Sequence, residues 1–334
     1  MKKWKSGISI QIKLNQKQKY AMAMIAACIL LVLPFVISNT YVMHVLITSG
    51  LYIGLSLSLN LVSGYAGQLS MGHAAFYGIG AYTTALLMLN LNMSFWLTLI
   101  ASIVVSGLAG LILGLPTSRL RGDYLTIVTL GFGEIVRLVL VNEIDITRGP
   151  MGLPGIPAPS LFGVELDSKR TFYYLVLLFV VIVTVFLSRL TTSGFGIAMM
   201  TVKEDEIAAQ SIGIYPMKYK LSAFILSAMI AGVTGSIYAT YVSFVSPDTF
   251  LFNDSATILA MVVLGGIGSI PGSIIGAVIL TVMPELLRSF SEYRMMLYGI
   301  LLVVMMNFKP TGIYGQEKRK RNIYKRQAGG IMHE

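Results

Sequence analysis

Uncharged apolar runs long enough to cross a lipid bilayer recur along the whole chain, and they constrain its fold more than any other feature. Residues 21–37, 95–115 and 171–187 are clear examples. A transmembrane helix needs about 20 predominantly apolar residues to cross a hydrocarbon core roughly 30 Å thick. Only 12% of the residues are charged, whereas soluble domains carry roughly 25%. The sequence therefore predicts an all-α, polytopic membrane bundle rather than a water-soluble globule.

Turn and charge signals between these runs divide the chain into about ten predicted spans. We expect them at residues 21–37, 43–62, 74–91, 95–116, 124–141, 172–190, 220–243, 256–268, 273–287 and 295–308. This division predicts a transmembrane domain at residues 21–308. A basic segment at residues 1–20 precedes it, and a basic tail at residues 309–334 follows it.

The formal net charge of +10 arises at the two ends of the chain. Residues 1–20 hold six lysines and no acid, and residues 309–334 hold seven basic residues and two acids. Basic segments beside membrane spans are typically cytoplasmic, so both termini are expected in the cytoplasm. The loop 244–255, with two aspartates and no basic residue, then lies outside, whereas the predicted outer loop 288–294 runs against the rule with two arginines. This distribution argues against a nucleic-acid partner.

A polar, glycine-rich break separates two apolar runs at residues 60–76. It holds the candidate pathway residues Asn60, Ser63, Gly64, Gly67, Gln68, Ser70, Gly72 and His73. Lipid cannot satisfy free backbone groups, so such a break is tolerated only inside protein or beside a water-filled cavity. Broken helices in transporters hold substrates or ions with these freed groups and with half-helix ends. The break therefore predicts part of a transport pathway, and a tight loop at the membrane surface is an equally good alternative.

A second glycine-rich break follows at residues 263–272. It supplies the candidate pathway residues Gly265, Gly266, Gly268 and Ser269. Paired breaks in two halves of a chain are typical of inverted repeats with a site between them. They favour two inverted five-span repeats with broken helices, although the two segments do not align residue by residue. The motifs Gly110-x-x-x-Gly114 and Gly272-x-x-x-Gly276 are best explained by ordinary close packing of helices.

Residues 203–213 form a charged segment between two predicted spans. Acidic residues suit the positive end of a helix dipole, and Gly213 can end a helix, so we expect one short helix here. This helix is either part of a solvated loop or a docking helix for a cytoplasmic partner. Docking needs an apolar ridge, for which Ile207, Ala208 and Ile212 are the candidates.

Charged residues within or beside the spans form two pairs at i, i+3 spacing, Glu134 with Arg137 and Glu285 with Arg288. Charge inside a membrane is costly and usually functional, but a structural salt bridge explains each pair at least as well. The single cysteine, Cys28, excludes a disulfide within the chain, and no G-x-x-x-x-G-K-[ST] phosphate loop is present. We therefore expect neither an enzyme nor a chain that binds a cofactor or metal.

Several ordered motifs of this sequence resemble the LivM-type permease family of branched-chain amino acid ABC transporters. The resemblance covers roughly residues 45–312. It rests on the first break followed by Tyr77-Gly78-Ile79-Gly80-Ala81-Tyr82, on Arg119–Tyr124, on Thr147–Gly152 and on Val263–Ser269. The segment from Lys203 to Gly213 is similar to the loop with which the family contacts its ATPase. Unlike the family, this chain has no basic residue at 196–202.

The resemblance implies a bacterial plasma-membrane importer built from two permeases, two cytoplasmic ATPases and an extracellular solute-binding protein. A LivH-type second permease would be the partner of this chain, and the ATP would be used by the ATPases. The substrates would be leucine, isoleucine and valine, and another amino acid, an amide or urea is the alternative. The ATPase contact would fall on Lys203, Glu204, Asp205, Glu206, Ala208, Ala209 and Gly213. An ion-coupled secondary transporter using Glu134 or Glu285 is the rival from another class.

Overall fold

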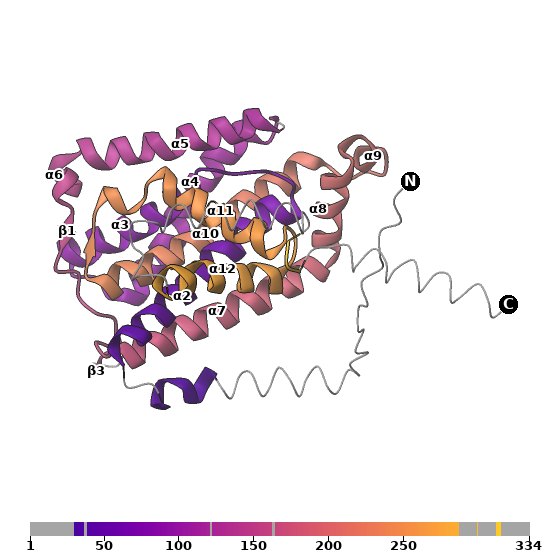
Figure 1. Cartoon of the computed structure of the whole chain (residues 1–334). Helices are drawn as coiled ribbons and strands as arrows, with labels where there is room; N and C mark the ends of the chain where they lie inside the picture. Colours follow the sequence, from indigo (N-terminus) through magenta and orange to yellow (C-terminus); the bar gives the residue numbers. More distant parts are fainter. Residues whose placement is uncertain are drawn as a thin grey trace.

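The computed structural model describes residues 30–36, 39–120, 122–161, 164–286, 299 and 312–314. Its long helices lie side by side in one bundle (Figure 1). The longer helices are α2 (Thr40–Asn60), α3 (His73–Leu91), α4 (Phe95–Thr117), α5 (Asp123–Asn142), α7 (Lys169–Thr192), α8 (Gly194–Glu204), α10 (Pro216–Val242), α11 (Phe252–Gly265) and α12 (Ile270–Leu286). The short helices are the π-helix η1 (Leu61–Tyr65), α6 (Ile144–Thr147), η2 (Gly149–Met151), α9 (Glu206–Ser211) and η3 (Pro247–Thr249). The two-residue strands are β1 (Leu153–Pro154), β2 (Ser160–Leu161), β3 (Val164–Glu165) and β4 (Phe244–Val245).

Seven helices in the described ranges are long and apolar enough to cross a membrane. The prediction of an all-α, multi-pass membrane bundle is therefore confirmed. The shorter apolar helix α12 corresponds to the predicted span 273–287. Of the predicted span 21–37 the structure describes only the helical stretch 30–36, and of the predicted span 295–308 only residue 299. The structure consequently does not test the count of about ten.

The centre of the bundle is formed by α2, α3 and α10. In the apolar window of α2 with η1, 72% of the residues are buried, and in those of α3 and α10 the share is 61%. The corresponding share of α5 is only 17%, and Figure 1 shows this helix along one edge of the bundle. The three central helices bury their side chains on nearly all sides, which is why their apolar pattern has no polar face.

Glycines allow α3 and α10 to pack with their backbones in contact. A Cβ atom added at Gly80 would lie 2.2 Å from the carbonyl oxygen of Gly232, and one added at Gly235 would lie 2.1 Å from the carbonyl oxygen of Tyr77. Small residues are common where membrane helices approach this closely, because association depends on van der Waals packing rather than on exclusion of water. The central pair of helices therefore depends on these glycines.

The two Gly-x-x-x-Gly motifs pack helices together, as predicted. A Cβ atom at Gly110 would lie 2.7 Å from Cβ of Ala228 on α10, and one at Gly114 would lie 2.7 Å from a methyl of Leu221. On the other side of the bundle, a Cβ atom at Gly276 would lie 2.1 Å from the carbonyl oxygen of Met261 on α11.

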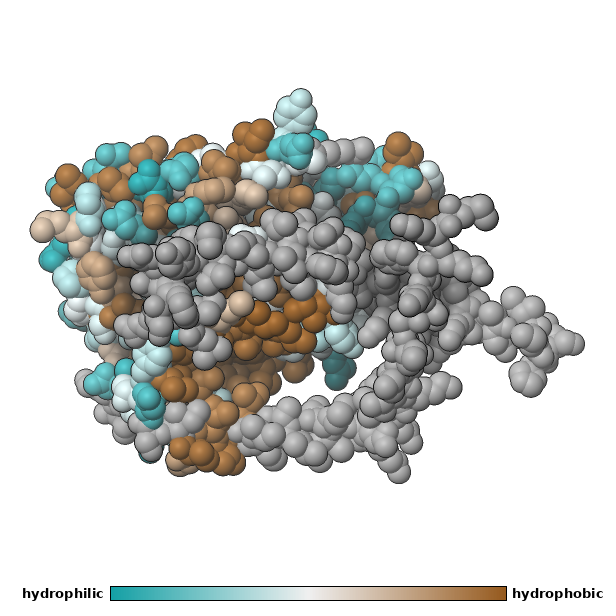
Figure 2. Space-filling view, viewed as in Figure 1, coloured by the Kyte–Doolittle hydropathy of each residue, from teal (hydrophilic) through white to brown (hydrophobic). Residues whose placement is uncertain are grey.

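The connections between helices gather at two opposite ends of the bundle. At one end, β1 pairs antiparallel with β4, which joins the connection 142–171 to the connection 244–251. The opposite end carries α8 and α9 (Figure 1). Figure 2 shows hydrophilic side chains gathered at that α8–α9 end and apolar side chains across the middle of the same face. This banding is expected for a bundle that lies across a bilayer.

The connection at residues 148–157 is a glycine-rich turn. Arg148, Gly149, Gly152 and Gly155 all have positive φ, between 54° and 78°. Thr147 closes the preceding helix by donating its hydroxyl hydrogen to the carbonyl oxygen of Leu140 at 2.6 Å. The segment cannot continue as a helix, because right-handed helical residues need negative φ.

Candidate functional site

The first glycine-rich break begins as a π-helix at the end of α2. In η1 the amide of Ala66 donates to the carbonyl oxygen of Leu61, five residues earlier, at 3.2 Å. The amide of Gln68 then reaches the carbonyl oxygen of Val62 at 3.0 Å, and Ser63 Oγ donates to the carbonyl oxygen of Gln68. Single π-helical turns of this kind often mark functional sites, because they widen the helix and free backbone groups.

Residues 66–72 connect η1 to α3 without regular structure. Gln68 and Ser70 are 3% and 0% exposed, whereas the intervening Leu69 is exposed. The helix α5 holds this segment: the amide of Met71 donates to Thr129 Oγ1 at 3.0 Å. A Cβ atom at Gly72 would lie 2.0 Å from the carbonyl oxygen of Thr129. Gln68 and Ser70 are therefore turned into the protein while Gly67 and Leu69 are exposed, and both the transport pathway and the tight loop at the membrane surface stay predictions.

The second break lies between α11 and α12. Gly266 and Gly268 have φ of 117° and 81°, so α11 ends at Gly265 and does not continue to residue 268 as predicted. Ser269 caps the next helix, because its Oγ accepts from the amide of Gly272 at 3.2 Å. The amide of Ile313 donates to the carbonyl oxygen of Leu264 beside this break. Its glycines thus turn the chain from one helix into the next.

The two breaks, although 208 positions apart, are in direct contact. The amide of Gly268 donates to Asn60 Oδ1 at 2.7 Å, and Asn60 is 1% exposed. A Cβ atom at Gly64 would lie 2.5 Å from the nitrogen and 2.8 Å from the Cα atom of Gly268. The structure therefore brings together the two segments that the sequence analysis singled out separately.

Several buried polar atoms in the first break have no hydrogen-bond partner among the described residues. They are Asn60 Nδ2, both side-chain polar atoms of Gln68 and the hydroxyl oxygen of Ser70. A buried polar group without a partner costs about 1–3 kcal/mol, and such groups in native proteins call for water, an ion or a ligand. This cluster gives the break the capacity to bind polar groups inside the bundle.

His73 is held by a hydrogen bond at the start of α3. Its Nε2 lies 2.6 Å from Ser58 Oγ, and the residue is 1% exposed. The carbonyl oxygen of Ser58 accepts in turn from Ser227 Oγ at 2.7 Å. The described residues contain no cluster of three histidine, cysteine, aspartate or glutamate side chains that could hold a metal. His73 thus joins α3 to Ser58 of α2, and the carbonyl group of Ser58 joins α2 to α10.

The charged segment 203–213 is not the single helix that was expected. Lys203 and Glu204 end α8, and Asp205 starts the separate helix α9 by accepting from the amides of Ile207 and Ala208 at 2.8 and 3.1 Å. The extended backbone of Asp205, with φ of −155°, explains the break. The expected start at residue 203 was therefore three residues before the start of α9 at Glu206.

The end of α9 agrees with the prediction. Gly213 has φ of 81°, its amide donates to Gln210, and the amide of Ile214 donates to Ala209. These two bonds form the Schellman arrangement, which favours glycine at this position. Ile207 and Ile212 are 71% and 70% exposed, so the predicted apolar ridge faces outward.

Lys203 connects this charged segment to the first break. Its Nζ donates to the carbonyl oxygen of Gly64 at 2.6 Å. A Cβ atom at Gly67 would lie 2.7 Å from Cγ of Lys203, so a larger residue would displace the lysine. Nearby, Glu206 forms an ion pair with Lys220 of α10. These two contacts join α8 to the π-helix and α9 to α10.

Of the two predicted salt bridges, Glu134–Arg137 and Glu285–Arg288, only the first lies within the described residues. Arg137 Nε lies 2.9 Å from Glu134 Oε2, so this predicted salt bridge is present on α5, with both side chains part-exposed. Glu285 accepts a hydrogen bond from the hydroxyl of Tyr41. Its predicted partner, Arg288, lies outside the described residues. Only the first pair can therefore be described as an ion pair.

Sequence reasoning missed several residues that hold these segments. They are Ser58, Thr129, Lys220, Ser227 and Ser255, and the last accepts from the amide of Ala74 at 2.9 Å. Isolated serines and threonines within apolar runs carry no signal of their own. Lys220 could have been found from the sequence, because a lysine at the start of a predicted span needs a partner.

Comparisons with known proteins agree with one another. The family model described as branched-chain amino acid transport system / permease component matches residues 41–306. The chain is 42% identical over 320 residues to the high-affinity branched-chain amino acid transport system permease protein LivM of Salmonella typhimurium, covering 89% of this chain and 75% of the relative. It is 43% identical over 303 residues to LivM of Escherichia coli, covering 84% and 71%.

A more distant relative is the permease protein LivH of Salmonella typhimurium, with 26% identity over 286 residues, 79% of this chain and 91% of the relative. No solved structure matches the chain. The family model covers most of the chain, including both glycine-rich breaks and α8–α9. This chain therefore belongs to the family of permease components of branched-chain amino acid transport systems.

Proposed function

We propose that this chain is the transmembrane permease subunit of an ABC importer that carries leucine, isoleucine and valine across the bacterial plasma membrane. The names of its LivM and LivH relatives support this substrate class. The assembly would contain a second, LivH-type permease, two cytoplasmic ATPases and an extracellular solute-binding protein. This chain would bind no cofactor and would have no ATPase activity of its own.

The proposed pathway runs beside the two glycine-rich breaks. Support comes from their contact through Asn60 and Gly268 and from the unpartnered polar atoms of Gln68 and Ser70. Groups of this kind can replace water around the charged ends of an amino acid as it crosses the membrane. The small hollow beside Glu134, at the start of α3, is a further candidate part of this route.

The α8–α9 end is proposed to face the cytoplasm, with both termini on that side. The basic ends of the chain support this orientation. In it, the exposed ridge of Ile207 and Ile212 is available to a cytoplasmic ATPase. The complete bundle would then have about ten spans in two inverted repeats, with residues 21–37 and 295–308 supplying the remaining two.

The hydrogen bond from Lys203 to Gly64 carries the mechanistic part of this proposal. Nucleotide-dependent motion of the ATPases would move α8 and α9, and Lys203 would pass that motion to the first break. Alternating access requires such a link, because a motor outside the membrane has to open and close a site within it.

The test is leucine uptake by proteoliposomes that contain the complete complex. Leucine uptake should require ATP on the side of the vesicle membrane that carries the ATPases. Unlabelled isoleucine and valine should reduce the uptake of labelled leucine. Lys203→Gln should reduce uptake at least tenfold while the complex still assembles. Lys169→Gln, a matched charge loss at the opposite end of the bundle, should leave uptake within about twofold.

Two results would overturn the proposal. Uphill uptake that follows a proton or sodium gradient without any ATPase would indicate a secondary transporter. Competition by an amide or urea, with none by leucine, would assign another substrate. Normal uptake by Lys203→Gln would remove the proposed link while leaving the substrate assignment intact.

A further inference from the structure

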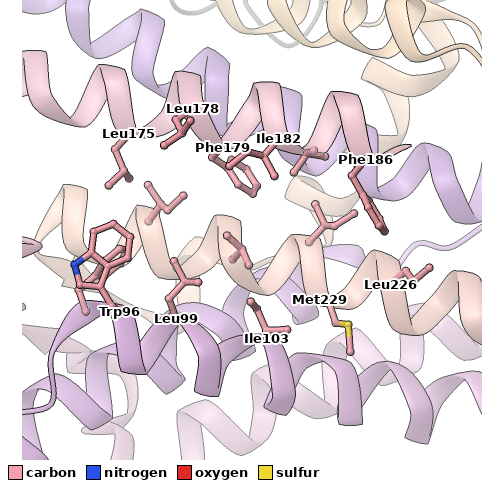
Figure 3. A pocket seen from close by; sticks show the side chains of 15 residues that line it. Trp96, Leu99, Ile103, Leu175, Leu178, Phe179, Ile182, Phe186, Leu226 and Met229 are labelled. Carbon is pink, nitrogen blue, oxygen red and sulfur yellow. The ribbon is translucent and has the colours of Figure 1, made fainter. Parts of the chain in front are cut away.

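A long apolar groove runs along the outside of the bundle between α4, α7 and α10 (Figure 3). Its volume is about 400 Å³, and all its lining residues are apolar or aromatic. Trp96 lies at one end and Phe186 near the other (Figure 3). Leu178 and Ile182, which line it, are 61% and 57% exposed. In a membrane protein, a surface of this kind is covered by lipid or by another apolar segment.

A second hollow, of about 380 Å³, continues the groove towards the α8–α9 end. It shares Phe186 and Leu226 with the groove and adds Leu190 and the polar Ser222. From Leu175 to Leu190 the two hollows extend about 22 Å along α7, at about 1.5 Å per residue. One leaflet supplies only about 15 Å, half of a hydrocarbon core roughly 30 Å thick. An acyl chain of one leaflet can therefore lie against protein over its whole length.

Two basic residues flank the polar end of this groove. Arg189 follows Phe186 by three residues on α7, and Lys218 precedes Ser222 by four residues on α10, so each lies on the face that lines the hollow. Ser222 Oγ also bonds to the carbonyl oxygen of Lys218 at 2.7 Å. In the described part of the chain neither side chain forms an ion pair. Arginine and lysine at this position favour a phosphate group.

The described end of the first predicted span contacts the first turn of α7. The hydroxyls of Tyr173 and Tyr174 donate to the carbonyl oxygens of Leu30 and Leu31, each at 2.9 Å. At about 100° per residue, Tyr173 projects away from the α7 face that carries Leu178, Ile182 and Phe186, whereas Tyr174 lies one turn before Leu178 on that side of the helix.

The segment that follows α12 also begins and ends away from the groove. It leaves α12 after Leu286, and Ile313 is bonded to Leu264 of α11. Neither α11 nor α12 lines the groove. Leu286 and Ile313 therefore do not line the groove, and an anionic lipid is the occupant whose chemistry fits an apolar groove with basic residues at one end.

We propose that this groove binds one anionic phospholipid, with an acyl chain between α4, α7 and α10 and the phosphate between Arg189 and Lys218. The site requires only that the bundle lies in a bilayer, so it does not depend on the substrate that is transported. Because the groove has basic residues at one end, the lipid bound there should carry a negatively charged headgroup, unlike the average lipid around the protein.

Native mass spectrometry of the complete complex tests whether the groove is the site, by titration with phosphatidylglycerol. Ile182→Trp places a large ring in the groove, whereas Val181→Trp places the same ring on the neighbouring, equally exposed face of α7. Ile182→Trp should weaken binding of phosphatidylglycerol at least tenfold, and Val181→Trp should change it less than twofold. Equal effects of the two variants would overturn the assignment, because a protein-filled groove or a general lipid shell would respond equally.

The headgroup is tested with the double variant Arg189→Gln/Lys218→Gln. Each basic residue near an anionic lipid surface contributes a factor of about five, so binding of phosphatidylglycerol should weaken about 25-fold. Binding of zwitterionic phosphatidylcholine should change much less. The control Lys169→Gln/Arg170→Gln removes the same charge at the other end of α7 and should have no effect. Equal affinity of the unaltered protein for the two lipids would refute the phosphate site.

Discussion

The contact between the two glycine-rich breaks can be tested with one methyl group. In Gly64→Ala, the new Cβ atom would lie 2.0 Å from Asn60 Oδ1, 2.5 Å from the nitrogen of Gly268 and 2.8 Å from its Cα atom. Carbon atoms make favourable contact only at about 3.5–4.0 Å. The second break therefore has to move by about 1 Å, and the hydrogen bond from Gly268 to Asn60 is lost.

The expected cost follows from these two changes. Overpacking in a close-packed interior costs about 1–3 kcal/mol. A buried hydrogen-bonding group left without its partner costs about 1–3 kcal/mol more. Alanine recovers up to about 1 kcal/mol relative to glycine in a helix. The free energy of unfolding should therefore fall by about 1–6 kcal/mol, a large part of the 5–15 kcal/mol typical of a native protein.

The matched control is Gly131→Ala on α5. Gly131 is helical, has no atom within 4 Å of an added Cβ atom, and should be neutral or slightly stabilised by alanine. The assay is the denaturation midpoint of the purified complex in mild detergent, measured together with ATP-dependent leucine uptake. If Gly64→Ala unfolds at the same midpoint as Gly131→Ala, the two breaks are not in the contact described above.

Three further predictions concern single residues. Glu206→Gln should cost about 3 kcal/mol of unfolding free energy, because it leaves the Lys220 side chain, which is 5% exposed, without its carboxylate partner. Lys220→Met should cost less, because it removes the buried charge itself. Equal denaturation midpoints of the two variants would contradict this order. Gln68→Cys, in a chain carrying Cys28→Ser, should react with a water-soluble thiol reagent during ATP turnover, and no reaction in any state would exclude water beside the first break. Gly213→Ala should cost about 1 kcal/mol, measured by the same denaturation assay, because φ is 81° in otherwise open space; no loss of stability would show that α9 ends differently.

The positions of the helices could be predicted well from apolar runs and glycine signals. Eight of the ten predicted spans correspond to described helices, α2–α5, α7 and α10–α12. The C-terminal end of α9 was correct, because positive φ at Gly213 is a local property. The predicted N-terminal start of α9 was wrong, because neither Lys203 nor Asp205 carries a sequence signal that a helix is interrupted there. Only the extended backbone of Asp205 separates α8 from α9.

The sequence by itself determined that this chain lies in a membrane, which segments form its helices and where polar, glycine-rich breaks interrupt them. Length, hydropathy and backbone freedom are local properties, and each can be assigned from neighbouring residues. Only the tertiary structure decided that Asn60 meets Gly268, that Lys203 reaches Gly64 and that α5 lies at the edge. These contacts join residues that are far apart in the chain. They depend on how closely whole helices approach one another where glycines line the contact.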